Sequence, residues 1–273
     1  AGTEVKFRER RPAAIEADDV SDNAQLRTQI ARTQGLQRKF EDAHGTLDTV
    51  EGMLTEDLTV AQIRYLLERG RTTNSSGNRE ASIPIFLKAW EISQSSGEDY
   101  WGVDVAHMLG IVEETSKQLE WNMTAIELAE KSEDQRAKRW LGSLYNNTGW
   151  TLFEMKNLDS AMDLFVKALG WYEERENDWA IRVAKWTIAR THREKGDVDR
   201  ALEMQKDLEA EYIALGGDKD GYVFEEMAEC YLLLGVNQKS RKYFLLAWQE
   251  LSKDEWLQAN EPDRLARLKK LSE

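Results

Sequence analysis

The chain has 273 residues, which fits one elongated domain or two of ordinary size. Acidic residues outnumber basic ones by 50 to 37, and the net charge of −13 argues against a general nucleic-acid binder or a partner of anionic membranes. A hydrophobic content of 41% excludes disorder over most of the chain, and three prolines are too few for a many-stranded sandwich or barrel. We therefore expect a helical protein.

The single cysteine, Cys230, permits neither an intrachain disulfide nor a cysteine-based zinc site, which suits a reducing, cytoplasmic compartment. Its apolar neighbours predict an inert, buried thiol. No apolar run approaches the roughly 20 residues needed to span a bilayer. The sequence thus predicts no membrane contact, no metal and no cofactor.

The N-terminal 54 residues divide into two segments of different composition. Residues 1–21 are charged, contain Pro12 and show no sustained hydrophobic period, which predicts a flexible arm. In residues 22–54, apolar side chains recur at helical spacing and predict one long amphipathic helix, with a break permitted at Gly35 or Gly45. This helix packs on the following helices or pairs two chains, so a monomer and a homodimer both remain open.

Residues 55–253 repeat a unit made of a helix, a short polar turn and a second helix. The second helices superpose on five triplets with steps of four and three residues: Ser82-Phe86-Ala89, Ala125-Ala129-Ser132, Ala161-Phe165-Ala168, Ala201-Gln205-Leu208 and Ser240-Phe244-Ala247. Successive triplets lie 36 to 43 residues apart. This spacing predicts an array of helical hairpins with a period near forty.

Two further positions of each hairpin carry structural signals. The residue twelve places before each triplet is small in four of five cases, which lets the two helices approach closely: Gly70, Glu113, Gly149, Ala189 and Ala228. The turn position five places before the triplet is often glycine, which ends a helix readily in the left-handed conformation: Gly77, Glu120, Lys156, Gly196 and Gly235. The second hairpin departs from both rules, and its register is uncertain by several residues.

The third hairpin, from Trp140 to Leu169, resembles a tetratricopeptide repeat (TPR). Its Asn146-Asn147-Thr148-Gly149 is similar to the Asn-Asn-Leu-Gly/Ala of the longer repeats in kinesin-light-chain-like proteins and bacterial peptide-sensing regulators. The resemblance implies an all-α, right-handed superhelix of about five hairpins over residues 55–253, with residues 254–273 as a C-terminal cap. Pro84 departs from the pattern and predicts a kink or a late start of its helix.

The resemblance also implies that the first helices line a concave groove, where binding residues gather. Asn146, Asn147 and Trp150 lie there one turn apart, and side-chain amides suit an extended peptide because they both donate and accept hydrogen bonds. In the resembled families an asparagine at the place of Asn147 does this. The alternative is that both amides are solvated or cap a neighbouring carbonyl.

The next first helix carries a basic stripe made of Arg182, Trp186, Arg190 and Arg193, with Lys185 on its flank. Arginine matches carboxylates and phosphates, so the stripe predicts an acidic partner, a C-terminal carboxylate or a phosphorylated peptide. The alternative is an internal ladder of ion pairs with Glu225, Glu226 and Glu229 of the fifth hairpin. Glu226 and His107 complete the set of candidate groove residues, although a structural role for His107 is the simpler interpretation.

Three functions remain open from the sequence. The first is a non-enzymatic scaffold that holds an extended, acidic protein or peptide segment. The second is a sensor for a small anionic metabolite whose output lies in the N-terminal helix. The third is a magnesium-dependent helical enzyme, since Asp18, Asp19 and Asp22 match the spacing of an aspartate-rich motif. For these aspartates, a solvated charge cluster is favoured over a magnesium site, because no second metal motif is present.

Overall fold

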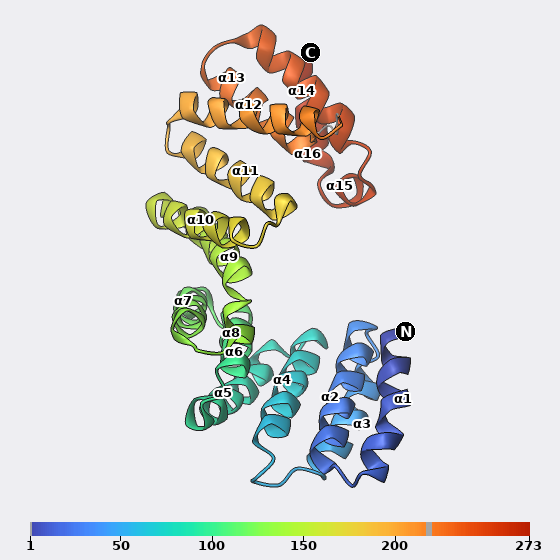
Figure 1. Cartoon of the computed structure of the whole chain (residues 1–273). Coiled ribbons are helices and arrows are strands. Elements are labelled where there is room, and N and C mark those ends of the chain that lie inside the picture. The colour runs from blue at the N-terminus through green and yellow to red at the C-terminus, as the bar shows by residue number, and fades with distance from the viewer. Residues whose placement is uncertain (1, 217–219) are drawn as a thin grey trace. The chain divides into compact units, whose positions relative to one another are not determined.

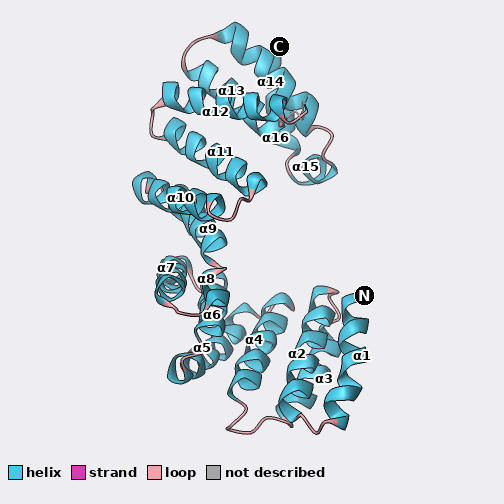
Figure 2. Cartoon of the chain, viewed as in Figure 1, coloured by secondary structure: helices cyan, strands magenta, loops and turns pink. Residues whose placement is uncertain are grey.

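The computed structural model describes residues 2–216 and 220–273, and all of its regular elements in these ranges are α-helices (Figures 1 and 2). They form two compact units, one ending at Leu144 and the other beginning at Tyr145. Most successive helices pack against each other within a unit. The all-α architecture of TPR-like hairpins expected from the sequence is confirmed.

The first unit contains α1 to α8 and the beginning of α9. These helices are α1 (Gly2–Glu16), α2 (Val20–Leu36), α3 (Phe40–Glu51), α4 (Thr59–Ser75), α5 (Arg79–Ser96), α6 (Asp99–Val112), α7 (Thr115–Lys131), α8 (Gln135–Lys138) and α9 (Leu141–Glu154). The second unit contains the remainder of α9 and seven further described helices. These are α10 (Leu158–Glu173), α11 (Asp178–Glu194), α12 (Val198–Ala214), α13 (Gly221–Leu233), α14 (Asn237–Leu251), α15 (Glu255–Asn260) and α16 (Pro262–Ser272).

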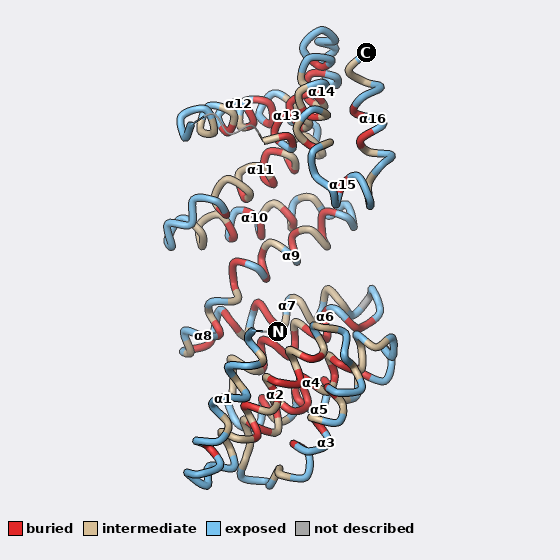
Figure 3. Tube along the Cα trace, turned by 90° about the vertical axis from the view of Figure 1, so that its right-hand side faces the viewer, coloured by how far each residue is buried: buried red, intermediate tan, exposed pale blue. Residues whose placement is uncertain are grey.

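The hairpin pattern read from the sequence is present in the structure. All fifteen side chains of the five triplets are at most 3% exposed. A Cβ atom added to Gly70 or Gly149 would lie 2.6 or 2.5 Å from the ring of Phe86 or Phe165, so these glycines permit the close crossing of the two helices. Buried residues accordingly recur along one side of the helices (Figure 3).

The predicted left-handed turns are also found. Gly77, Gly196 and Gly235 have φ of +97°, +88° and +72°. Lys156 takes the same conformation without being glycine, with φ of +61°. Each of these residues ends the first helix of its hairpin and lets the second begin within a few residues.

The N-terminal segment differs from the prediction of a flexible arm. Residues 2–16 form α1, which packs on α2 and buries Ala14. The side chain of Gln37 donates a hydrogen bond to Glu4 over 3.0 Å, and Glu4 also binds Arg8 one turn along the helix. Pro12 lies inside this helix, where its breaking tendency and the high charge hide the helical pattern.

The prediction of a single long helix over residues 22–54 is also wrong, because a turn separates α2 from α3. Arg38 forms the turn with φ of +61°. The triplet Ala43-Leu47-Val50 follows it by five residues, and Ala31 precedes the triplet by twelve; all four side chains are 0% exposed. These are the offsets of the other hairpins, so the described chain contains a sixth hairpin. Its apolar face, expected to pair with neighbouring helices or a second chain, is buried within the first unit.

The second repeat is built differently from the others. Glu113 lies outside α6, with an extended backbone, and is not the small residue of the helix crossing. Gly110 has that place, because its added Cβ would lie 2.1 Å from Oδ1 of Asn122 in α7. The register expected from the sequence is therefore displaced by three residues. In the first repeat, α5 begins at Arg79 and contains Pro84, so the late start is wrong.

Candidate functional site

Three aromatic side chains of the second unit form a row across successive first helices, which we call the aromatic row: Trp150 of α9, Trp186 of α11 and Tyr222 of α13. The ring centroids of Trp150 and Trp186 are 6.2 Å apart, as are those of Trp186 and Tyr222. The indole Nε1 of Trp186 donates a hydrogen bond to the backbone oxygen of Tyr222 over 3.1 Å. Two members were predicted. Tyr222 was missed, although it follows Trp186 by 36 residues, close to one repeat.

Arg190 lies over this row. The centre of its guanidinium group is 5.6 Å from the ring centroid of Trp150 and 5.4 Å from that of Trp186, a cation–π arrangement. Its Nε is buried and finds no hydrogen-bond partner among the described residues. One carboxylate oxygen, Oε1 of Glu226, lies 3.7 Å from its Nη1. Arg190 is thus held in place while part of its donor capacity is unused.

Arg193, one turn further along α11, has a different role. Its Nε and Nη2 donate to the two carboxylate oxygens of Glu226 over 2.7 and 3.1 Å. Glu226 is only 3% exposed. Burial lowers the pKa of Arg193, but the hydrogen bonds and charge of Glu226 outweigh it and raise this pKa above its usual value. Arg193 and Glu226 thus form the internal ion pair that was the alternative to ligand binding for the basic stripe.

The other glutamates of α13 are also bound by arginines, in this case from α16. Arg264 donates to Glu225 over 2.5 Å, and Arg267 donates to Glu229 over 2.5 Å. A cavity of about 420 Å³ lies among these side chains, and the described residues that line it are Arg190, Arg193, Glu225, Glu226, Glu229, Glu261, Arg264 and Arg267. Equal numbers of opposite charges line the cavity, so it does not favour an acidic partner.

The remaining members of the basic stripe contact α12. Lys185 lies 2.5 Å from Oε1 of Glu211. The guanidinium centre of Arg182 is 5.4 Å from the ring centroid of Tyr212. The predicted stripe therefore divides among three neighbouring groups and does not present one continuous basic surface.

The two predicted amides contact each other. Asn146 donates a hydrogen bond from Nδ2 to Oδ1 of Asn147 over 3.2 Å. Asn147 is exposed and Asn146 is half-buried. In the register of the hairpins, Asn147 takes the same place as Thr187 and Glu226, both of which are buried. Among these three equivalent positions, Asn147 alone is exposed.

His107 belongs to the first unit. Its ring centroid is 5.5 Å from that of Trp140. Burial lowers the pKa of His107; Asp104 opposes this shift and Arg71 adds to it. Arg71 itself is bound to Glu68 and Asp104 across α4 and α6. His107 therefore borders a buried ionic network of the first unit.

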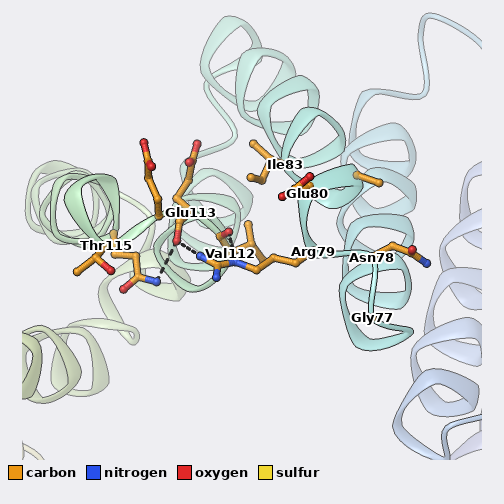
Figure 4. A pocket seen from close by; sticks show the side chains of 11 residues that line it. Gly77, Asn78, Arg79, Glu80, Ile83, Val112, Glu113 and Thr115 are labelled. Atoms are coloured by element: carbon orange, nitrogen blue, oxygen red, sulfur yellow. Dashed lines mark hydrogen bonds between the residues drawn. The ribbon is translucent and has the colours of Figure 1, made fainter.

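A cavity of about 820 Å³ lies in the first unit where α5 begins and α6 ends. Figure 4 shows Arg79 reaching across it to the backbone. The Nε of Arg79 donates to the carbonyl oxygen of Val112 over 2.6 Å, and its Nη2 donates to that of Glu113. Gln118 donates to the same Glu113 oxygen over 2.9 Å. These side chains cap the C-terminal end of α6, which the extended turn after it leaves without backbone partners.

Replacing Arg79 by alanine is expected to destabilise the first unit by about 1–3 kcal/mol, because the carbonyl oxygen of Val112 loses its side-chain donor and that of Glu113 keeps only Gln118. Urea unfolding followed by circular dichroism measures the loss. Lys88→Ala, an exposed change on the same helix, serves as the control and should shift stability by no more than about 0.5 kcal/mol. Equal effects of the two changes would contradict the capping role.

The aspartate cluster near Asp19, the possible metal ligands and Cys230 were the other groups singled out in the sequence. Asp19 accepts a hydrogen bond from the backbone N–H of Asp22 over 2.8 Å and so caps α2. In the described ranges, no three His, Cys, Asp or Glu side chains are grouped to hold a metal ion. Cys230 is 0% exposed, and burial raises its pKa to about 12, as expected for an inert thiol. Among the described helices, none is long and apolar enough to cross a membrane.

Comparison with known sequences supports the third hairpin as the most typical one. A family model of the tetratricopeptide repeat matches residues 142–175, which lie in α9 and α10 and the turns that follow them. The resemblance to TPR sequences is thereby confirmed. No curated protein sequence matches the chain.

Solved structures share the fold at low sequence identity. A signal-transduction ATPase with a TPR sensor from Pyrococcus horikoshii has a TM-score of 0.71 at 16% identity, covering 92% of this chain and 39% of that one. BtubC (BKLC) from P. vanneervenii has a TM-score of 0.63 at 14% identity, with 81% and 92% covered. A kinesin-light-chain-like protein with nearly identical TPR-like repeats from Podosopora anserina has 0.54 at 12% identity, with 69% and 94% covered. The chain thus spans well under half of the ATPase's length, and these similarities concern the fold alone.

Proposed function

We propose that this protein is a non-enzymatic scaffold that binds an extended protein or peptide segment along the first helices of its second unit. Asn147, Trp150, Trp186 and Arg190 form the centre of this binding surface. The observation that carries the proposal is the position of Arg190, whose side chain is 31% exposed, lies over two indole rings and has its Nη1 3.7 Å from Oε1 of Glu226.

Arg190 differs from the other arginines nearby in what it contacts. Arg193, Arg264 and Arg267 each donate to a glutamate at 3.1 Å or less. The 3.7 Å separation between Arg190 and Glu226 is longer than a hydrogen bond. A ligand oxygen at this position would gain a charge-assisted hydrogen bond, and the flanking indoles would exclude water from it.

The charge pattern narrows the chemistry of the partner. Because the arginines around the charged cavity are balanced by glutamates, a long acidic segment gains little there. A partner with one carboxylate placed at Arg190 fits better, and the exposed amide of Asn147 is suited to its backbone. We therefore propose a segment with a single acidic group, held mainly through main-chain and aromatic contacts.

The test is peptide capture by the whole chain. Twelve-residue peptides selected from a random phage-displayed library on the wild-type protein are measured by fluorescence anisotropy against an Asn147→Ala, Arg190→Gln double variant. We expect binding to weaken by about tenfold or more, since hydrogen bonds to charged groups are worth about 1.5–3 kcal/mol. The melting temperature should stay nearly unchanged, because both side chains are partly exposed.

Arg200→Gln is the matched control, since Arg200 is 53% exposed and pairs with Glu203 on α12. This variant should bind the selected peptides as the wild type does. Retained affinity in the double variant would refute the binding surface. Failure to enrich any peptide on the wild-type protein would count against the peptide-binding function itself.

A further inference from the structure

A cavity of about 500 Å³ in the first unit is lined by basic and aromatic side chains. Its described walls are Tyr100 of α6, Arg136 of α8, Arg139 and Trp140 between α8 and α9, and Ser143 of α9. No carboxylate is among these described residues, although the whole chain has a net charge of −13. The cavity therefore presents positive charge in an acidic protein.

Arg136, the first of the two arginines, is partly engaged. Its Nε and Nη2 bind the carboxylate of Asp134 over 3.0 and 2.7 Å, and its guanidinium centre lies 5.0 Å from the ring centroid of Tyr100. The hydrogen bonds to Asp134 raise the pKa of Arg136, and the charge of Glu98 adds to this shift. Its Nη1 has no hydrogen-bond partner in the described ranges, so one nitrogen of the group is left for a ligand.

Arg139 is less engaged than Arg136. Its side chain is exposed, and no ion pair or hydrogen bond joins it to another described residue. One free and one partly free guanidinium group match an anion with several oxygens and more than one charge better than a single carboxylate. A phosphate monoester, with a charge of about −1.5 to −2 at neutral pH, is such an anion. Ser143 lies in the first turn of α9, where the helix dipole also favours a negative group.

Two aromatic rings add flat apolar surface to the same cavity. Trp140 is half-buried, with its ring centroid 5.5 Å from that of His107. Tyr100 contacts Trp101 edge to face, with ring centroids 4.7 Å apart. These contacts hold both rings in place while both still line the cavity. Aromatic side chains beside a phosphate site are suited to stack on the flat ring of a nucleobase.

The size of the cavity and the charge of the protein limit the size of the ligand. A volume of about 500 Å³ is typical of pockets for small molecules. A long nucleic acid would bring many phosphates to a protein with a net charge of −13, which disfavours it. A small molecule with one phosphate and one base meets both conditions.

We infer that this cavity binds a nucleoside monophosphate, with the phosphate on Arg139 and Nη1 of Arg136 and the base on Trp140. The inference concerns the first unit and goes beyond the scaffold function proposed for the second unit. It involves reversible binding and no chemical step.

Isothermal titration calorimetry of the whole protein tests the inference with AMP, GMP, CMP and UMP as ligands. The tightest of the four is then compared with its nucleoside, which lacks the phosphate, and with ribose 5-phosphate, which lacks the base. We expect the nucleotide to bind about tenfold or more tightly than either fragment, since each fragment loses one set of contacts. O-phosphotyrosine carries a phosphate and a ring in another arrangement, and it should bind more weakly than the nucleotide.

Arg139→Gln removes the charge of an exposed side chain that has no described partner, so the fold should tolerate it. It should weaken the nucleotide about tenfold or more and leave its nucleoside unaffected. Arg139→Lys keeps the charge but not the planar donors, and it should retain part of the affinity. Arg10→Gln is the matched control, because Arg10 is also exposed in the first unit and does not line the cavity. This control should bind the nucleotide as the wild type does.

Three results would overturn the inference: equal affinity for the nucleotide and its nucleoside, unchanged nucleotide binding in Arg139→Gln, or no binding of any nucleotide. Tighter binding of O-phosphotyrosine than of every nucleotide would also overturn it, because the cavity would then suit a phosphorylated side chain. None of these results decides the peptide test of the second unit, since that test depends on Asn147 and Arg190 and not on Arg139.

Discussion

Replacing Glu226 by alanine is expected to destabilise the second unit by about 3 kcal/mol, because the largely buried guanidinium group of Arg193 loses both hydrogen bonds to Glu226 and keeps only the one to Glu194 over 3.2 Å. Arg193 makes two hydrogen bonds to Glu226, and its side chain is 14% exposed. Water therefore cannot fully replace the lost partner. Urea unfolding followed by circular dichroism gives the change in the free energy of unfolding.

Two variants test this explanation. Glu203→Ala removes a carboxylate that is 63% exposed and pairs with Arg200, and it should cost no more than about 1 kcal/mol. Glu226→Leu combined with Arg193→Met removes both buried charges, and it should be less destabilised than Glu226→Ala alone. If Glu226→Ala unfolds at the same urea concentration as Glu203→Ala, the ion pair has no structural importance.

Gly149→Ala is expected to destabilise the second unit by about 1–3 kcal/mol. The new Cβ would lie 2.5 Å from a ring carbon of Phe165, which is 1% exposed. The helices α9 and α10 must then separate, although alanine favours a helix over glycine by itself. Thermal and urea unfolding measure the loss.

Gly170→Ala supplies a control of opposite sign. Gly170 lies inside α10, and a Cβ added there meets nothing within 4 Å among the described residues. It should therefore stabilise the protein by about 0.5–1 kcal/mol through helix propensity. Gly149→Ala combined with Phe165→Leu should recover part of the loss, since the smaller side chain frees the crossing. Stabilisation by Gly149→Ala would contradict the prediction, because it would mean that a Cβ atom fits between α9 and α10.

The hairpins could be predicted from the sequence because their signals are local and repeat. The steps within each triplet and the small residue before it lie within one hairpin, so no long-range information is needed. The α2–α3 hairpin has the same offsets but escaped detection, since its turn residue is Arg38 where glycine was expected. Helix α1 escaped because it buries a single side chain, that of Ala14, and its sequence is dominated by charge.

The candidate site was only partly predictable, for a different reason. Helical spacing places Arg190 and Arg193 on one stripe, but their partners belong to other helices. Arg193 is bound by a glutamate of α13, whereas Arg190 lies over two indole rings. Arg193 has a structural role and Arg190 has the proposed binding role, although they lie only one turn apart on the same helix. The arginines of α16 form ion pairs with the other glutamates of α13. These pairs could not be predicted from the repeat pattern, because α16 lies outside the repeats.

The repeated offsets of the six described hairpins have a consequence for how such a chain changes in size. Each hairpin uses the same small-residue crossing, so insertion or loss of about forty residues can leave the remaining interfaces intact. Duplication of a whole hairpin then lengthens the molecule without changing the contacts inside the hairpins already present. The hairpin is thus the smallest part of this chain that can be repeated with its own core complete.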